Sequence, residues 1–491
     1  MGRHHEPRAR PARVRHRGRS SDGAASRPSP RQRRHTVRIL HLILLLLLCG
    51  AMVTGVGAQA QPQTRKVSVD GLIYDLKHPD PDRRVEAARL LGVHKLNQAV
   101  PALIEAAADP QPTVRLAVLE ALAKIRDPRA LHTYITLTAD TEANIRQKAI
   151  AALLEVYVVD ESGFVAGTRK VIDFLNPFDS DYNTLVVEPY VPVSADAVQA
   201  LALRLEDPEA GVRKAAVMGL GTLRGRAALP QMKDVLSREP ENGIKIEYFR
   251  SFYKIGDPDA CSRLVPYVND PDKAVHDEAI LTSGLLRCKE SVDAIMDIYQ
   301  MGIKEREKVF GVIPASSSDD LQIKCLQALA LIGDDRAAKL YLPALRHDKE
   351  DFRVAAAEGL ARLADPQYQP ALVERSAGAK GKRFQLALAY AFYRLGHKER
   401  LQDMVRELGG MKHGDQMFGY LVELTPDQLA DLYPHLRASK GKTRIRILEA
   451  IGVAGAAQNL AEIQSYTHDS DADVASAAMV AVRRIQARQG I

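Results

Sequence analysis

The sequence contains no tryptophan, and aromatic residues make up only 5% of its 491 residues. Apolar residues nevertheless account for 46% of the chain, so its core must be built mainly from alanine, leucine, valine and isoleucine. Side chains of this size suit closely packed helices. The chain is also too long for one compact core, which favours an architecture assembled from smaller units.

Cysteine is scarce as well. After Cys49, which lies near the N-terminus, only Cys261, Cys288 and Cys325 remain, and so small an odd number is not a disulfide framework. Cys325 lies on an apolar helix face, which predicts a core position. For Cys261 and Cys288 the count favours free thiols, and a disulfide between them in an oxidising compartment is the alternative.

The short motifs of common hydrolases and metalloenzymes are absent. There is no His-Glu-x-x-His, Gly-x-Ser-x-Gly or Cys-x-x-Cys. Gly441-Lys442-Thr443 is similar to the end of a phosphate-binding loop, but Leu436 stands where that loop needs glycine, and the predicted preceding element is a helix rather than a strand. We therefore predict no catalytic residues, no metal and no cofactor.

A basic surface for nucleic acid is also missing, although the formal net charge is +7. Residues 1–38 hold 12 arginines and two acids, and residues 39–60 hold no charged side chain. Residues 61–491 therefore carry a net charge of −3. Nucleic-acid binding requires cations gathered on a folded face, so we predict no nucleic-acid partner.

The basic N-terminal segment is typical of a protein that is exported. Arginines precede an almost unbroken apolar run over residues 39–56, followed by the small-x-small pattern of Gly57-Ala58-Gln59-Ala60. Residues 1–60 are thus predicted to be a signal peptide cleaved after Ala60, which would place the protein in the periplasm or another extracytoplasmic space. The alternative is an uncleaved anchor over residues 39–58, since this run is just long enough to span the inner membrane. A true start downstream of Met1 is a further open possibility.

What the rest of the chain does contain is an internal period. Residues 114, 117, 118, 121, 122 and 125 are apolar at the spacing of one helix face. The same frame recurs, and direct steps between frames are 31 or 32 residues. The first apolar position of the frame is held by Val114, Ile145, Val212, Ile244, Val275, Leu321, Phe352, Phe384 and Val474.

A second, shorter helix is predicted between consecutive frames, for example over residues 98–108, 129–138 and 426–437. Asp-Pro marks many of the junctions, beginning at Asp109, Asp127, Asp207, Asp257, Asp270 and Asp365. Aspartate accepts hydrogen bonds from the free N–H groups of a first helical turn, and proline is tolerated there. Thr425 and Gln428 add a capping box. Helix pairs of this length cannot fold singly and must stack.

Asp-Pro, Val-Arg, an Ala-rich stretch, Leu-Gly or a similar step, and a second Asp-Pro together resemble HEAT repeats, most closely the short variety of phycobilisome-lyase-like proteins. The resemblance implies an all-α superhelix, a HEAT-type α-solenoid of about twelve helix pairs, and a monomer. It also brings two enzyme families into view. Deoxyhypusine hydroxylases use repeated His-Glu pairs, but the chain has only His5-Glu6, and phycobilin lyases act on pigment proteins that an exported chain would not meet. An enzymatic role of lyase or oxidoreductase type is therefore a distant possibility.

A basic residue often follows the first apolar residue of the frame. In HEAT stacks such an arginine typically bonds an aspartate of the same or the next repeat. The resemblance therefore implies an internal ladder, with a row of ligand-binding bases as the alternative. The best matches are Arg115, Arg146, Arg213 and Arg353.

The period is interrupted twice, which divides the mature chain into repeats over 61–156, an insertion over 157–194, and repeats over 195–491 with a loop near 301–318. The first insertion holds six aromatic residues among 38, which argues against disorder. It is expected to be either a plug on the repeat core or a lid that binds a partner, whereas the second is expected to be a solvated loop. The candidate binding residues of the first insertion are Phe164, Phe174, Phe178, Tyr182 and Tyr190.

A milder charge asymmetry lies toward the C-terminus, where residues 375–446 carry 14 basic and 7 acidic side chains. These bases are either scattered over a solvated face or gathered to meet an anionic surface. The candidate patch is Lys380, Lys382, Arg383, Lys440 and Lys442.

Taken together, these features favour an extracytoplasmic scaffold or adaptor that binds a protein or peptide. An accessory module that binds a small ligand or an anionic cell-envelope polymer is the alternative. Association with the membrane is expected only through the N-terminal apolar segment.

Overall fold

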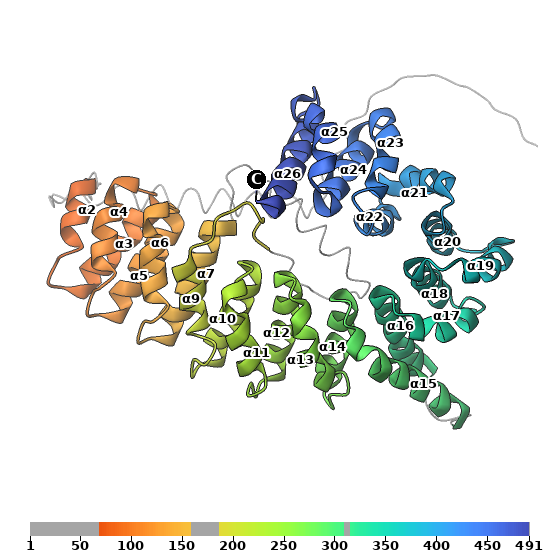
Figure 1. The fold of residues 1–491 in the computed structure, drawn as a ribbon. Coiled ribbons are helices and arrows are strands. Elements are labelled where there is room, and N and C mark those ends of the chain that lie inside the picture. The colour runs from red at the N-terminus through yellow and green to blue at the C-terminus, as the bar shows by residue number, and fades with distance from the viewer. Residues whose placement is uncertain (1–67, 159–185, 309–314, 491) are drawn as a thin grey trace, which may run out of the picture. The chain divides into compact units, whose positions relative to one another are not determined.

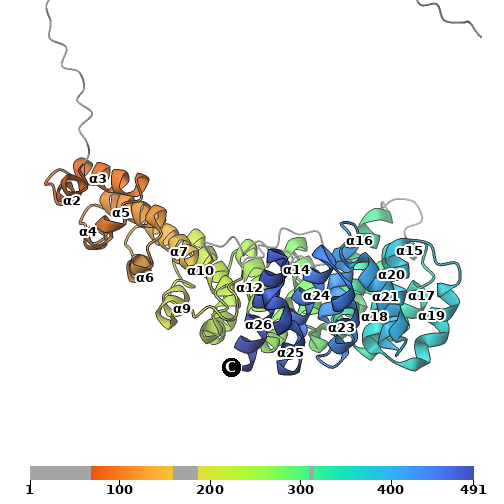
Figure 2. The same cartoon turned by 90° about the horizontal axis from the view of Figure 1, so that it is seen from above.

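The computed structural model describes residues 68–158, 186–308 and 315–490. Every regular element in these ranges is a helix, as predicted, and the α-helices form twelve successive pairs. Figure 1 shows the pairs following one another along the chain, and Figure 2 shows the first three in single file from above. The leader, the cleavage position Ala60 and residues 159–185 lie outside the described ranges.

The first helix of each pair is usually short. The first helices are α2 (Val69–Asp75), α4 (Val100–Ala106), α6 (Leu131–Leu137), α9 (Ala195–Ala202), α11 (Leu229–Leu236), α13 (Cys261–Leu264), α15 (Val292–Lys308), α17 (Ala338–Ala344), α19 (Gln369–Ser376), α21 (Leu401–Leu408), α23 (Tyr433–Ala438) and α25 (Leu460–Gln464).

The second helix of each pair carries the apolar frame. The second helices are α3 (Pro81–Val93), α5 (Pro112–Ile125), α7 (Ala143–Val158), α10 (Ala210–Thr222), α12 (Asn242–Ile255), α14 (Lys273–Leu285), α16 (Ala315–Ile332), α18 (Glu350–Leu363), α20 (Lys382–Arg394), α22 (Gly414–Val422), α24 (Gly441–Ala454) and α26 (Ala472–Gln489). Of the nine first apolar positions named above, eight are buried and Leu321 is half-buried.

Most first helices begin with a 3₁₀ turn rather than as one continuous α-helix. The six predicted Asp junctions behave as expected, since each carboxylate accepts a hydrogen bond from the N–H group two residues ahead. The capping box of Thr425 and Gln428 is also confirmed, with both reciprocal bonds present. The 3₁₀ turns are η1 (Asn97–Ala99), η2 (Pro128–Ala130), η3 (Arg226–Ala228), η4 (Pro258–Ala260), η5 (Val265–Tyr267), η6 (Lys289–Ser291), η7 (Asp335–Ala337), η8 (Pro366–Tyr368), η9 (Lys398–Arg400), η10 (Gln428–Leu432), η11 (Ala457–Asn459) and η12 (Ser465–His468).

Neighbouring pairs pack mainly through their second helices, such as α3 on α5 and α24 on α26. Glycine permits close approach at these crossings. A Cβ atom added to Gly92 would lie 2.6 Å from the Cα of Ala121, and one added to Gly452 would lie 2.7 Å from the Cα of Ala481. The Leu-Gly step of the repeat is therefore a packing requirement between backbones.

The expectation of a solvated loop near 301–318 is wrong for most of that segment. Helix α15 continues to Lys308, and α16 already begins at Ala315, which leaves only residues 309–314 outside the described ranges. The reason lies in Lys304-Glu305-Arg306-Glu307-Lys308, whose residues are strong helix formers with opposite charges three positions apart. None of the described helices is both long and apolar enough to cross a membrane.

Candidate functional site

The recurring arginines form a ladder between consecutive repeats. Arg115 donates from Nε and Nη2 to the two carboxylate oxygens of Asp140 at 2.7 and 2.8 Å. Arg146 holds Asp207 in the same way at 2.8 and 2.7 Å, and Arg213 holds Glu239 at 3.0 Å through both nitrogens. The same contact occurs at Arg84 with Asp109, and Arg444 reaches Asp469 through Nη1 alone at 3.0 Å. Neither position was among the best sequence matches.

Each rung also ties down the backbone. The Nη1 group of Arg115 donates to the carbonyl oxygens of Asp109 and Pro110, six and five residues earlier. The carboxylate of Asp140 accepts at the same time from the N–H of Glu142. Burial alone would raise the pKa of Asp140, but the hydrogen bonds from Arg115 and Glu142 hold it below its usual value. These five arginine–carboxylate contacts join consecutive repeats, so the five described arginines that make them are not a row of free bases.

Arg353 occupies the ladder position of its repeat but makes a different set of contacts. Its Nη1 donates to the carbonyl oxygens of His347 and Asp348, and Nη2 lies 3.4 Å from the carbonyl of Lys380. Its guanidinium carbon lies 5.4 Å from the ring centroid of Phe384. No ion pair to Arg353 occurs among the described residues.

The five bases of the predicted patch are exposed and lie at the N-terminal ends of two helices. Lys382 pairs with Glu407 at 2.8 Å, and Arg383 pairs with Asp351 at 2.5 Å. Lys440 and Lys442 lie two repeats farther on, at the start of α24. The structure therefore places the patch in two separate groups, and two of its charges are already neutralised.

A cavity of about 520 Å³ adjoins the first of these groups. Its floor includes the buried side chains of Leu386 and Phe392 on α20. Its rim includes Lys382, Arg400 and Arg406, with Asp403 3.5 Å from Arg400 and 3.6 Å from Arg406. The combination of an apolar floor and a cationic rim suits a small amphipathic anion.

The described end of the aromatic insertion is anchored in the repeat core. Val186 and Val187 are buried, and the N–H of Val187 donates to the carbonyl of Thr222 at the end of α10 over 2.8 Å. At the other side of the insertion, Tyr157 accepts a hydrogen bond from the N–H of Ser194 at 3.2 Å. Of the candidate binding residues only Tyr190 is described, and Phe164, Phe174, Phe178 and Tyr182 lie outside the described ranges.

The anchored segment also contacts the last helix of the chain. Arg484 of α26 donates to both carboxylate oxygens of Glu188 at 2.9 and 2.6 Å, across 296 residues of sequence. Beside it, the guanidinium of Arg483 lies 5.8 Å from the ring centroid of Tyr190. In Figure 1 the blue C-terminal helix lies next to the yellow segment that leads into α9. We call the contacts of residues 186–190 with α10 and α26 the seam.

A second long-range cluster, also missed from the sequence, crosses several second helices. Arg362 donates to both oxygens of Glu423 at 2.8 Å, and both side chains are buried. The Tyr390 hydroxyl donates to Glu423 at 3.0 Å, and the Tyr390 ring stacks on that of Tyr420 at 4.3 Å. Burial would raise the pKa of Glu423, but Arg362 keeps it below its usual value. The cluster joins α18, α20 and α22, so its role is to fix the packing of three repeats.

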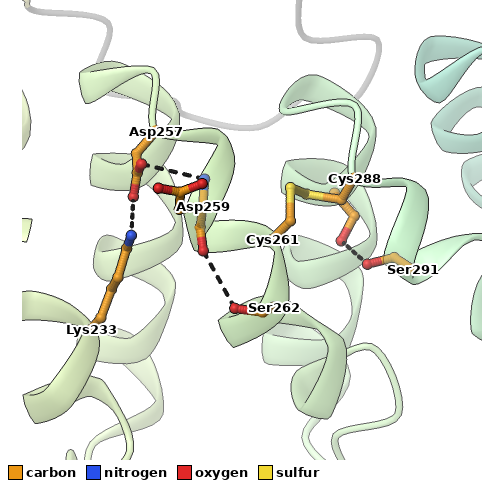
Figure 3. The surroundings of a disulfide bond; sticks show 8 residues. Lys233, Asp257, Asp259, Cys261, Ser262, Cys288 and Ser291 are labelled. Carbon is orange, nitrogen blue, oxygen red and sulfur yellow. Dashed lines mark hydrogen bonds and ion pairs between the residues drawn. A yellow bond between two sulfur atoms is a disulfide. The ribbon is translucent and has the colours of Figure 1, made fainter. Parts of the chain in front are cut away.

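Cys261 and Cys288 form a disulfide, so the expectation of free thiols is wrong at these two positions. Figure 3 shows that the bond joins the start of α13 to the residue before η6, next to the capped turn at Asp257. The stacking of repeats explains the pairing, because Cys261 begins the first helix of one repeat and Cys288 directly precedes the 3₁₀ turn of the next, 27 residues later. Cys325 is fully buried and free, as predicted, and burial raises the pKa of its thiol.

No group of three or more histidine, cysteine, aspartate or glutamate side chains able to hold a metal occurs in the part of the chain that the structure describes. His276 and Asp277, one of three His-Asp steps in the repeats, lie on α14, where Asp277 pairs with Lys324 at 3.0 Å. The carboxylate of Asp277 therefore joins α14 to α16 through an ion pair.

Comparison with known proteins matches residues 69–154 and 312–392 to the model of HEAT repeats. A segment of 99 residues is 31% identical to a deoxyhypusine hydroxylase of Aspergillus oryzae, covering 20% of this chain and 29% of the relative. The matched segment thus spans less than a third of that relative.

Among solved structures, the chain is similar to YibA of Escherichia coli, with 16% identity and a TM-score of 0.36 over 60% of this chain and 92% of that one. It is also similar to the CpcE–CpcF complex of phycocyanin lyase from Nostoc sp. PCC7120, with 15% identity and a TM-score of 0.26 over 70% and 99%. Residues 69–154 and 312–392 thus match HEAT repeats, and the residues that the structure describes form an α-solenoid of twelve stacked helix pairs.

Proposed function

We propose that this chain is a non-enzymatic, extracytoplasmic scaffold that holds a protein or peptide partner at its aromatic insertion. The observation that carries the proposal is the anchoring of the insertion at the seam. Val187 is bonded to α10 and Glu188 to α26, and the ring of Tyr190 lies beside Arg483 of α26. An aromatic side chain held on a rigid support is well suited to bind a partner, because little conformational entropy is lost on binding.

Export is supported by two independent features. The apolar run of residues 39–56 follows an arginine-rich start, and a disulfide joins two consecutive repeats. Disulfides persist mainly in oxidising compartments. N-terminal sequencing of the protein from its native envelope tests this localisation. A mature chain that begins at Gln61 supports cleavage after Ala60, an uncleaved chain in the membrane fraction supports the anchor, and a chain in the cytosolic fraction contradicts export.

The partner site is tested by replacing residues 164–182 with a Gly-Ser linker of equal length. This range spares Val187 and Glu188, whose loss would disturb the seam. We expect the helical circular-dichroism signal to stay unchanged and crosslinking to the native partner to be lost. A matched variant with Phe164, Phe174, Phe178 and Tyr182 all changed to serine keeps the chain length and should give the same result. Full crosslinking by both variants would contradict the proposal.

A second candidate function is favoured by the cavity between α19, α20 and α21. Its cationic rim and apolar floor suit a small amphipathic anion or the anionic groups of an envelope polymer. Changing Lys380, Lys382, Arg383, Lys440 and Lys442 to glutamine should release the protein from isolated envelope polymer if this function operates. Unchanged association would exclude this second function. The Arg400→Gln variant alters the cavity rim alone, so it distinguishes binding in the cavity from binding to the surrounding surface charge.

A further inference from the structure

Arg353 lacks the carboxylate that each of the other described ladder arginines holds. In the rungs of Arg84, Arg115, Arg146, Arg213 and Arg444, a carboxylate oxygen lies within 3.0 Å of the guanidinium. In one of these rungs, the hydrogen bond to Asp140 raises the pKa of Arg115. Arg353 differs because the acid itself is missing from the sequence.

The position of the missing acid follows from the register of the ladder. Each acid lies six residues before the next ladder position, as Asp109 does before Arg115 and Glu239 before Lys245. After Arg353 the next ladder position is Gln385, so the acid's place is taken by Ala379. The contacts agree with this register, since Gln385 donates to the carbonyl of Ala379 at 2.8 Å, as Arg115 does to that of Asp109.

Only the capping task of the missing carboxylate is taken over, and at a different N–H group. In the rung of Asp140 the acid accepts from the N–H two residues ahead, whereas here Glu350 accepts from the N–H of Phe384 in the first turn of α20 at 3.1 Å. At the Nε–Nη2 edge of Arg353 no described carboxylate is bound, and Nη2 donates to the carbonyl oxygen of Lys380 at 3.4 Å. The Nη1 group is bound to two carbonyl oxygens and the guanidinium lies beside the Phe384 ring, so the side chain is held in place with that edge free of a carboxylate.

The surroundings favour an anion at this edge. Arg353 is half-buried, and the exposed Lys380 lies next in sequence to the place of the missing acid. Residues 375–446 have twice as many basic as acidic side chains. A planar guanidinium binds a carboxylate through two parallel hydrogen bonds, which is the arrangement that the intact rungs already use.

We propose that the Nε–Nη2 edge of Arg353 is a docking point for a carboxylate of an acidic peptide segment, which completes the broken rung from outside. The inference rests on the proposed function as a protein-binding scaffold and names the chemistry of one contact. An arginine preorganised by backbone contacts and an aromatic ring is the type of residue that contributes most to binding at an interface.

The test is to restore the rung within the chain. Ala379→Asp places a carboxylate at the vacant position, and we expect it to raise the melting temperature of the full chain. It should also weaken, by about tenfold, the binding of a fluorescein-labelled peptide of alternating glutamate and glycine, measured by anisotropy at low salt. Arg353→Gln should weaken binding similarly without raising the melting temperature.

Ala430→Asp is the matched control, because it adds the same charge at an exposed position within the same basic region and outside the ladder register. It should change peptide binding less than twofold if the contact is specific. Equal losses from Ala379→Asp and Ala430→Asp, or unchanged binding by Ala379→Asp, would overturn the proposal. Replacement of residues 164–182 should leave peptide binding intact, so failure of this contact and failure of partner capture at the insertion are told apart.

Discussion

The ladder carboxylates combine two tasks in one side chain, and this makes them the most sensitive polar residues of the repeats. Asp140 binds the guanidinium of Arg115 and caps the turn before α7. Its side chain is only 4% exposed, so its removal leaves a nearly buried arginine without a counter-ion.

We expect Asp140→Asn to lower the free energy of unfolding by about 2–4 kcal/mol. Because the folded-state pKa of Asp140 lies below its usual value, its stabilisation is present above the unfolded pKa and is lost as the pH falls through the folded one. The difference between the two chains in urea unfolding should therefore shrink under acid. Glu120→Gln, which breaks the exposed pair with Lys148, is the control and should cost less than about 0.5 kcal/mol.

Lys254 on α12 shows the opposite case of a charge that is buried at a cost. Its side chain is 6% exposed, and burial lowers its pKa to about 8. Below that pH both states are protonated and the folded state bears the full penalty, which fades as the pH rises toward the unfolded value. Lys254→Met should therefore stabilise the chain by up to roughly 3 kcal/mol at pH 7, and by much less at pH 10.5.

Thermal unfolding of both chains across this pH range checks the expectation. Lys214→Met provides the comparison, since Lys214 is half exposed and lies 3.9 Å from Glu247, whose charge also acts on Lys254. A pH-independent gain from Lys254→Met, or an equal gain from Lys214→Met, would contradict it.

The arginine ladder could be predicted from the sequence, because the repeat places a base such as Arg115 at a fixed position of each frame. The missing carboxylate at Ala379 could not be predicted, since the match at Phe352-Arg353 says nothing about the residue 26 positions later. The disulfide was missed for a related reason. The number of cysteines argues against pairing, whereas the geometry of consecutive repeats brings Cys261 and Cys288 together.

At the scale of the helices, stability depends on close approach between successive second helices. Gly92 of α3 faces Ala121 of α5 with no room for a side chain. The sequence shows the glycine as part of the repeat, but only the packing shows that a backbone lies against it.

Gly92→Ala should destabilise the chain by about 1–3 kcal/mol, because the added methyl group forces α3 and α5 apart. Helix propensity alone would give the opposite sign. Gly71→Ala is the matched control, since its added Cβ meets only Ser68 at 3.7 Å. It should be neutral or stabilise by up to about 1 kcal/mol. Urea unfolding distinguishes the two, and a stabilising Gly92→Ala would refute the packing argument.

At the scale of the complete stack of repeats, the seam links two segments that lie far apart in the sequence. Glu188 and Arg484 are separated by 296 residues, and nothing local in either segment indicates the contact. The same holds for Arg362 and Glu423, whose 61-residue separation corresponds to two repeats. Twelve helix pairs are therefore predictable from the sequence, whereas contacts beyond the next repeat are not.

We expect Glu188→Gln to loosen the seam without unfolding the repeats. Arg484 is 8% exposed and would lose the carboxylate that compensates its buried charge. Amide hydrogen exchange in α26 should speed up, while exchange in α3 and α5 stays the same. Glu86→Gln, which removes an exposed pair with Arg89, should leave α26 unchanged. Equal protection of α26 in the Glu188→Gln variant and the parent chain would show that the seam does not hold this helix.

The most direct test of the scaffold function is to find where the partner touches the chain. Tyr182 and Tyr190 of the insertion, and the 76% exposed Tyr74 of α2 as the control, can each be replaced by the photocrosslinker p-benzoylphenylalanine, which preserves an aromatic side chain. We expect crosslinks to the same partner in the native envelope from positions 182 and 190 and none from position 74. Crosslinks of equal yield from all three positions, or from position 74 alone, would contradict docking at the aromatic insertion.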